Sequence, residues 1–279
     1  MSIAAEIVHD SLGEHPFVTR LSRLMNFSAD DLKSLERIVE SERLVKRRQD
    51  LVVIGSVYRS LCFVKDGYAI RYKLLRSGKR QILNVILPGD VIGFPVSFFD
   101  RSIYSVVAVS DLTYNICSLD SYVRLCYEQP QFGLALSWLA AHEAAIYAEH
   151  IVDLGRRTPL ERLAHFLLEI HARLLAVGRA EAASFELPFS QEIMADALGL
   201  SVPHLNRVMQ QLRADQLITS RSRLIELNNV TSLQTLAQYQ PLDLAPIPVP
   251  TISTWGQHGS IAGPRSAKGQ KRTKAQSRM

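Results

Sequence analysis

Between Glu42 and Leu119 the chain alternates short apolar segments with turn residues. Segments such as LVVIGS, SLCFVKDG and YAIRYKLLRSG are separated by Asp66-Gly67, Ser77-Gly78 and Pro88-Gly89-Asp90, at intervals of about ten residues. Short β-strands joined by tight turns produce this pattern. It predicts an antiparallel β-roll that is similar to a jelly roll.

From Ser121 onward the apolar positions recur at helical spacing. Pro130 suits the first turn of a helix, and no Pro or Gly interrupts the segment between Gly133 and Gly155. A narrow stripe along it predicts a helix that pairs with the same helix of a second copy. The stripe consists of Leu134, Trp138, Ala141, Ala145, Ala148 and Val152. A second stripe, formed by Leu136, Leu139 and Ile146, leaves packing on the β-roll as an alternative that is compatible with the first.

Two further helices are indicated by N-cap signals. Ser28 precedes the amphipathic segment ADDLKSLERI, and residues 1 to 20 before it are expected to be flexible. Thr158 and Pro159 suit the N-cap and the first position of the helix LERLAHFLLEIHARLLAV.

The segment SQEIMADALGLSVPHLNRVMQQLR predicts a helix-turn-helix. Ser190 and Ser201 suit N-caps, and Gly199 lies where the tight turn requires a positive φ. The second helix buries Leu205, Val208, Met209 and Leu212, while its other face carries donors, one positive charge and no acid: His204, Asn206, Arg207, Gln210 and Gln211. This composition favours a helix that reads bases in the major groove, rather than one of two ordinary core helices.

The segment LITSRSRLIEL predicts a wing, because it has the pattern of a β-hairpin. Arg221 and Arg223 in it are expected to contact phosphate groups, which position a protein on DNA without reading its sequence. The complete set of residues predicted to bind DNA is Ser190, Gln191, Ser201, Pro203, His204, Asn206, Arg207, Gln210, Arg221 and Arg223.

The net charge of +5 does not by itself indicate DNA binding. Six basic and no acidic residues follow Leu244, so the remainder of the chain carries about one net negative charge. DNA affinity in the folded part must therefore come from a local patch. The Pro-, Gly- and Ser-rich segment 241–279 is predicted to be a disordered basic tail.

Other classes of function find little support in the sequence. Cys62, Cys117 and Cys126 form no metal-binding or disulfide pattern, so we expect reduced, buried thiols, with a redox switch as the weaker alternative. No metal site is expected, and no catalytic motif is present, so an enzyme is not expected. The first residues lack the order of a secretory signal and the apolar runs are short, so we expect a cytoplasmic protein without membrane contact.

The combined motifs resemble the Crp/Fnr family of bacterial transcription regulators. The resemblance rests on FVKDGYAIRYKLLRSGKRQILNVILPGDVIGF, ERLAHFLLEI and ALGLSVPHLNRVMQQLRADQLI, and it spans residues 20 to 235. It implies an α+β fold in which a β-roll sensor domain (21–129) is followed by a dimerisation helix (130–157) and a winged helix-turn-helix domain (158–235). It further implies a homodimer on a palindromic DNA site, with RNA polymerase as a candidate partner. The family's recognition positions fall on Pro203, Asn206 and Arg207, and only Arg207 keeps the frequent family residue, so the base preference of well-known members does not carry over.

Departures from the family pattern argue against cyclic AMP as the effector, unless a one-residue gap restores Arg101 to the family's position. Members that bind cyclic nucleotides carry a Gly-Glu pair where this chain has Gly93 and Phe94, and Arg101 and Ser102 lie one residue away from the family's Arg-Ser position. Tyr147 and Ala148 replace the Thr-Ser pair on the dimer helix. Gly93, Phe94, Arg101, Ser102 and Tyr147 therefore outline a pocket for an unknown small molecule, or for none.

Two alternatives stay open at this point. The N-terminal cysteine cluster of oxygen-sensing relatives is absent, whereas a haem bound through His142, His150 or Met194 is not excluded, although each is more simply a surface or core residue. The second alternative is a ligand-sensing module that acts through protein contacts and binds DNA weakly. Asn206 and Arg207 favour the DNA-binding regulator.

Overall fold

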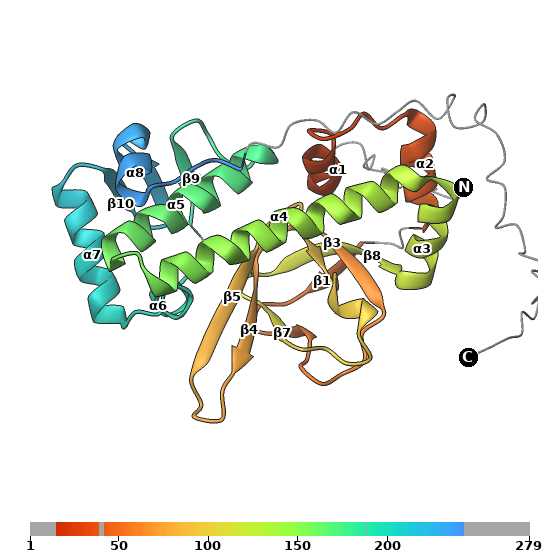
Figure 1. Cartoon of the computed structure of the whole chain (residues 1–279), viewed down its shortest axis with the longest axis horizontal. Helices are drawn as coiled ribbons and strands as arrows, with labels where there is room; N and C mark the ends of the chain where they lie inside the picture. The colour runs from red at the N-terminus through yellow and green to blue at the C-terminus, as the bar shows by residue number, and fades with distance from the viewer. Residues whose placement is uncertain (1–14, 39–41, 188, 243–279) are drawn as a thin grey trace, which may run out of the picture. The chain divides into compact units, whose positions relative to one another are not determined.

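The computed structural model describes residues 15–38, 42–187 and 189–242 of the chain. Helix α4 (Pro130–Gly155) runs alongside a β-roll and leads to the C-terminal helices (Figure 1). None of the helices within these ranges is both long and apolar enough to cross a membrane. The predicted basic tail, from residue 243 onward, lies outside the described residues.

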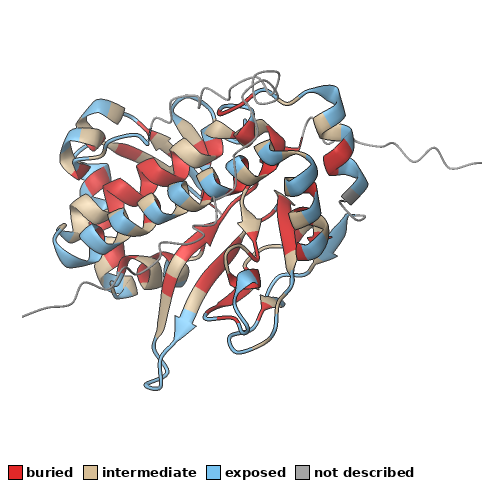
Figure 2. Cartoon of the chain, turned by 45° about the vertical axis from the view of Figure 1, so that its right-hand side comes forward, coloured by how far each residue is buried: buried red, intermediate tan, exposed pale blue. Residues whose placement is uncertain are grey.

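The β-roll consists of two four-stranded antiparallel sheets, as the alternating pattern predicts. The strand order is β1-β8-β3-β6 in one sheet and β2-β7-β4-β5 in the other. Their bounds are β1 (Arg43–Val45), β2 (Asp50–Val52), β3 (Ser60–Asp66), β4 (Ala69–Leu74), β5 (Arg80–Ile86), β6 (Val91–Ile92), β7 (Ser105–Ala108) and β8 (Leu112–Ser118), with a short 3₁₀ helix, η2 (Val96–Phe98). Buried residues line these strands, whereas the far end of the β4–β5 hairpin is exposed (Figure 2).

A glycine is required in the turn between β3 and β4. Gly67 has φ +84°, and a Cβ atom there would lie 2.2 Å from the backbone oxygen of Asp111. Both its left-handed conformation and the close approach of the two backbones exclude a side chain. The turn residue singled out by the sequence pattern is therefore needed for the roll to close.

The residues before the roll differ from the sequence prediction of a flexible segment. The prediction of a flexible segment at residues 1–20 is wrong for residues 16–20, which belong to helix α1 (Pro16–Leu21). Phe17 is buried, and its ring lies 4.4 Å from that of Phe63 in β3, so the roll provides an apolar contact that the local sequence does not reveal. Helix α2 (Ala29–Ile38) follows, and Ser28 and Asp31 exchange side-chain to backbone hydrogen bonds at its start.

The two apolar stripes of α4 have different environments. Leu136, Leu139 and Ile146 are buried against the same chain, partly by helix α3 (Leu119–Glu128). Leu134 and Val152, from the other stripe, remain more than two-fifths exposed, at 42% each. The packing of α4 on its own chain thus leaves an apolar surface available on the opposite side.

The C-terminal part contains the predicted helix-turn-helix and more structure than predicted. Its elements are α5 (Pro159–Ala176), β9 (Ser184–Glu186), α6 (Gln191–Leu198), α7 (Val202–Ala214), β10 (Ile218–Arg221), β11 (Leu224–Leu227) and α8 (Val230–Ala237). Helix α5 begins with a capping box between Thr158 and Glu161. Strand β9 adds a third strand to the predicted hairpin, in the order β10-β11-β9, and α8 packs on α5.

Candidate functional site

Helices α6 and α7 are joined by a turn with defined caps. The Ser190 hydroxyl accepts the backbone N–H of Ile193, and the Ser201 hydroxyl accepts that of His204. Gly199 ends α6 in the left-handed conformation, at φ 63°. The local signals in the sequence therefore define both helix starts and the turn between them.

Helix α7 has one buried and one exposed face. Leu205 and Leu212 are fully buried, whereas Pro203, Arg207 and Gln210 are exposed. Asn206 donates from Nδ2 to Oε1 of Gln191 in α6, at 3.2 Å. The exposed face thus carries polar donors from α7 and no carboxylate of that helix, a composition suited to base edges and phosphates.

The wing presents its two arginines to solvent. Arg221 and Arg223 are both exposed at the turn between β10 and β11, where Ser222 has φ 54°. The backbone oxygen of Arg223 accepts the N–H of Leu187, at 2.7 Å. The guanidinium groups are accordingly placed at the tip of a backbone that is fixed by its own hydrogen bonds.

A positioning residue of the helix-turn-helix was not identifiable from the sequence. Arg162 in α5 donates from Nη1 to the backbone oxygen of Leu198 and from Nη2 to that of Arg157, at 3.2 Å for the latter. These carbonyls end α6 and follow α4, respectively. Arg162 therefore ties the turn before α7 to the end of α4, and its partner Leu198 lies 36 positions away in the sequence.

The residues predicted to outline an effector pocket are only partly brought together. Phe94 lines a small cavity between the roll and α4, and the Tyr147 hydroxyl bonds to Arg71, which lines it as well. Arg101 is exposed and donates to the backbone oxygen of Gly55 at 2.9 Å, whereas Ser102 is buried and donates to that of Tyr104 at 2.6 Å. Gly93 lies against the backbone of strand β3 at Ser60.

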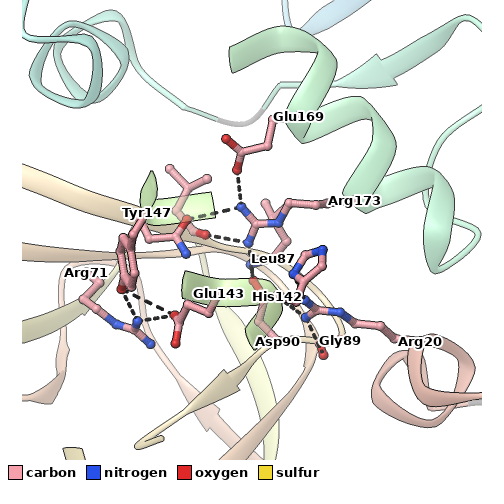
Figure 3. A network of polar contacts seen from close by, with 12 residues as sticks. Arg20, Arg71, Leu87, Gly89, Asp90, His142, Glu143, Tyr147, Glu169 and Arg173 are labelled. Carbon is pink, nitrogen blue, oxygen red and sulfur yellow. Dashed lines mark hydrogen bonds and ion pairs between the residues drawn. The ribbon is translucent and has the colours of Figure 1, made fainter. Parts of the chain in front are cut away.

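Arg71 occupies the space between the roll and α4. This strand-β4 side chain is fully buried, and its Nη1 contacts Glu143 and Tyr147 on α4 (Figure 3). Its guanidinium also lies 4.5 Å from the ring centroid of Tyr104. The cavity that remains has a volume of about 30 Å³, which is room for water molecules only.

A second set of ion pairs joins the roll to helices α1 and α5. Arg173 in α5 binds Asp90 at 2.6 Å and Glu169 at 2.7 Å, and Asp90 also pairs with Arg20 of α1 (Figure 3). Burial alone would raise the pKa of Asp90, but Arg173 and Arg20 outweigh it and lower the pKa. The carboxylate is therefore charged and connects three elements.

His150 of α4 is held between two acceptors. One ring nitrogen lies 2.7 Å from Glu169 and the other 3.2 Å from the backbone oxygen of Leu83. Burial opposes the charged ring, but Glu169 raises the His150 pKa; the Glu169 pKa, which burial would raise, is lowered to about 2 by His150 and Arg173. Both groups are thus stabilised in their charged forms.

Comparisons with known proteins agree on one family. Residues 42–126 match the cyclic nucleotide-binding domain model, and residues 161–236 match the Crp-like helix-turn-helix domain model. The nitrogen fixation regulation protein FixK of Bradyrhizobium diazoefficiens is 36% identical over 149 residues, which cover 53% of this chain and 62% of that protein. The chain thus spans less than two thirds of that relative.

Other relatives extend over more of the sequence. The transcriptional activator protein Anr of Pseudomonas aeruginosa is 26% identical over 215 residues, covering 76% of this chain and 87% of the relative. The solved structure of FixK2 from Bradyrhizobium japonicum aligns with a TM-score of 0.64 and 29% identity, covering 70% of this chain and 96% of that one. With its β-roll, winged helix-turn-helix and matches to both domain models, the chain belongs to the Crp/Fnr family of transcription regulators.

Proposed function

We propose that the protein is a homodimeric regulator that reads a palindromic DNA site through α7. The observation that carries this proposal is the exposed face of α7, where Arg207, Asn206 and Gln210 lie together without an acidic neighbour on the helix. Arg bonds to guanine O6 and N7, and Asn or Gln to adenine N6 and N7. Arg221 and Arg223 of the wing hold the flanking phosphates.

Dimerisation is assigned to residues 130–157. The exposed apolar side chains of α4 include Ile151, at 72% exposure, as well as Leu134, Val152 and Leu154. Pairing of two such helices would remove this surface from water and relate the two recognition helices by a two-fold axis. The half-sites would then lie about 34 Å apart, one turn of DNA.

The DNA-binding function does not require cyclic AMP. Arg71 fills the space between the roll and α4 and satisfies Glu143 and Tyr147, and the residual cavity of about 30 Å³ is too small for a nucleotide. A cyclic nucleotide would have to displace a buried ion pair and leave Glu143 without its partner, which is costly. The roll thus serves as a scaffold in this proposal.

The cellular setting follows from the proposed partner. Chromosomal DNA is read in the cytoplasm, which is the location we assign, and RNA polymerase is the candidate protein partner at a promoter. The alternative of a module that acts mainly through protein contacts is disfavoured by the polar, acid-free surface of α7.

Selection of bound fragments from fragmented genomic DNA tests the proposal directly. The purified full chain should enrich an inverted repeat with half-sites about 10 base pairs apart, centre to centre, without added nucleotide. Enrichment without a common motif would contradict sequence-specific reading, and a motif that appears only with cyclic AMP would contradict the role given to Arg71.

A further inference from the structure

A larger pocket lies outside the roll. It has a volume of about 400 Å³ and is bordered by α1, the turn between β5 and β6, α4, α5 and the segment that follows α8. Arg20, Asp90 and Arg173 contribute to both this pocket and the small roll cavity, but the remaining walls differ. The volume falls within the range of small-molecule sites.

The side chains that line this pocket carry more positive than negative charges. Three guanidinium groups, those of Arg20, Arg23 and Arg173, face two carboxylates, those of Asp90 and Glu169. Both carboxylates are engaged in ion pairs with Arg173, and Asp90 also pairs with Arg20. One positive charge of the lining, that of Arg23, is therefore not matched by an acidic side chain of the same lining, and an anion would compensate it.

Hydrogen-bond donors gather at the same place. Arg20 uses Nη1 for Gly89 and Asp90 and Nη2 for Nδ1 of His142, at 3.0 Å, which leaves its Nε–H without an acceptor among the described residues (Figure 3). The Nε1–H of Trp138 is buried without a partner among the same residues. The Cζ atom of Arg20 lies over the Trp138 ring, 5.8 Å from its centroid, so the indole is a neighbour of this guanidinium.

His142 adds no charge to the lining. Burial, reinforced by Arg20, lowers its pKa to about 4, so the ring is neutral at pH 7. Its ring stacks on Trp138 at a centroid distance of 5.3 Å. The polar end of the pocket thus presents cations and donors but no free acceptor with a negative charge.

The opposite wall is apolar. Leu24 from the turn after α1, Ile146 from α4 and Leu175 from α5 line the pocket, and Ala172 and Ala176 leave room because their side chains are short. Such a surface accommodates hydrocarbon, and its burial by a ligand would contribute binding free energy in proportion to area.

We propose that this pocket binds a small organic carboxylate with an apolar body. The carboxylate contacts Arg20 and Arg23, which both line the pocket, and the hydrocarbon packs on Leu24, Ile146 and Leu175. This proposal does not rest on the DNA-binding function proposed above, because binding to the pocket can be measured without DNA.

Octanoate tests the proposal, with octanamide as the uncharged probe of matched shape. Trp138 and Trp255 are the two tryptophans of the chain, so the full-length Trp255→Phe protein reports the pocket through Trp138 fluorescence. Octanoate should change this fluorescence saturably and bind at least about ten-fold more tightly than octanamide, since charge-assisted hydrogen bonds are about twice as strong as neutral ones.

Three variants in this background locate the binding. Arg20→Gln should weaken octanoate about ten-fold and leave octanamide nearly unchanged. Ala176→Phe, which fills the pocket without altering a charge, should abolish the response to both probes. Arg179→Gln removes an arginine that is not part of the lining and should bind octanoate like the parent protein.

Equal affinity for the two probes would overturn the carboxylate assignment. Octanoate binding that survives Ala176→Phe, in a variant whose thermal unfolding matches the parent, would overturn the location. A flat fluorescence response to octanoate in the parent protein, confirmed by calorimetry, would overturn the site altogether.

Discussion

Arg80 in β5 donates two hydrogen bonds to one carboxylate oxygen of Asp196 in α6, from Nε at 2.9 Å and from Nη2 at 2.5 Å. The pair connects the β4–β5 hairpin of the roll to the first helix of the helix-turn-helix. The side chains are 32% and 36% exposed, so water weakens their attraction.

A double-mutant cycle measures what this pair contributes. Arg80→Ala, Asp196→Ala and the double variant should give a coupling free energy of about 0.2–1 kcal/mol in urea unfolding, the range of exposed ion pairs. A coupling near zero at low salt would show that the two groups are held by their surroundings and not by one another.

Arg207 is expected to carry sequence preference. Arg207→Ala should weaken binding to the selected site by about 1–3 kcal/mol and flatten the difference between that site and unrelated DNA. Arg221→Ala should instead weaken binding to both DNAs similarly and make the salt dependence shallower. Mobility shifts at several salt concentrations distinguish the two, with the exposed Arg101→Ala as control. Unchanged preference in Arg207→Ala would mean that another surface reads the bases.

The exposed apolar side chains of α4 predict how an added negative charge would affect dimerisation. Ile151→Asp should shift the protein from dimer to monomer in sedimentation velocity, because two carboxylates would face each other in an apolar contact. Binding to the palindrome should fall with it. Tyr127→Asp, at a residue that is 85% exposed in α3, serves as control for a surface charge. A stable Ile151→Asp dimer would place the interface elsewhere.

Glu169 predicts how stability depends on pH. Its folded pKa of about 2 lies below the ordinary value of 4.5, so its contribution is present above pH 4.5 and is lost as the pH falls toward 2. The loss should be on the order of a few kcal/mol, because the group is buried and paired. Urea unfolding between pH 2 and 6 should show a shallower decline for Glu169→Gln, which is already less stable at pH 6.

A control variant and a second pH range, set by His150, complete this test. Glu36→Gln, at an exposed site, should follow the parent curve. His150 acts in the opposite sense: its raised folded pKa gives stability below pH 6.5 that is lost as the pH rises through the folded value. If Glu169→Gln declined as steeply as the parent at low pH, the acid sensitivity would arise from other carboxylates.

Gly67 and Gly78 form a matched pair for backbone strain. Both have positive φ, +84° and +80°, but a Cβ atom at Gly78 would meet nothing within 4 Å. Gly78→Ala should therefore cost about 1–2 kcal/mol, the conformational penalty alone. Gly67→Ala should cost several kcal/mol or prevent folding, because of the contact with the Asp111 oxygen. Thermal unfolding of the two variants compares them, and equal losses would mean that the β3–β4 turn relaxes freely.

The sequence predicts best the features that depend on neighbouring residues. Ser190, Gly199 and Ser201 define the helix-turn-helix within a dozen residues, and the structure places both caps and the turn as expected. Helix α8 was missed although Asn229 caps it, because two turns carry too few apolar positions for a periodic signal.

Features that depend on distant partners were beyond sequence reasoning. Arg71 lies in a strand where burial of a cation is unexpected. Glu143 and Tyr147, more than 70 residues away, and the ring of Tyr104 make this burial favourable. Helix α1 is likewise fixed by Phe63, and β9 by its pairing with β11. Local patterns carry no information about such contacts.

The buried guanidinium of Arg71 also has an evolutionary consequence. Shortening this one side chain would leave a polar hollow whose shape and charge preference match a guanidinium ion, with Glu143 and Tyr147 already arranged around it. A single substitution at this position would thus convert a filled site into one that accepts a small cation, without a change in the strands of the roll.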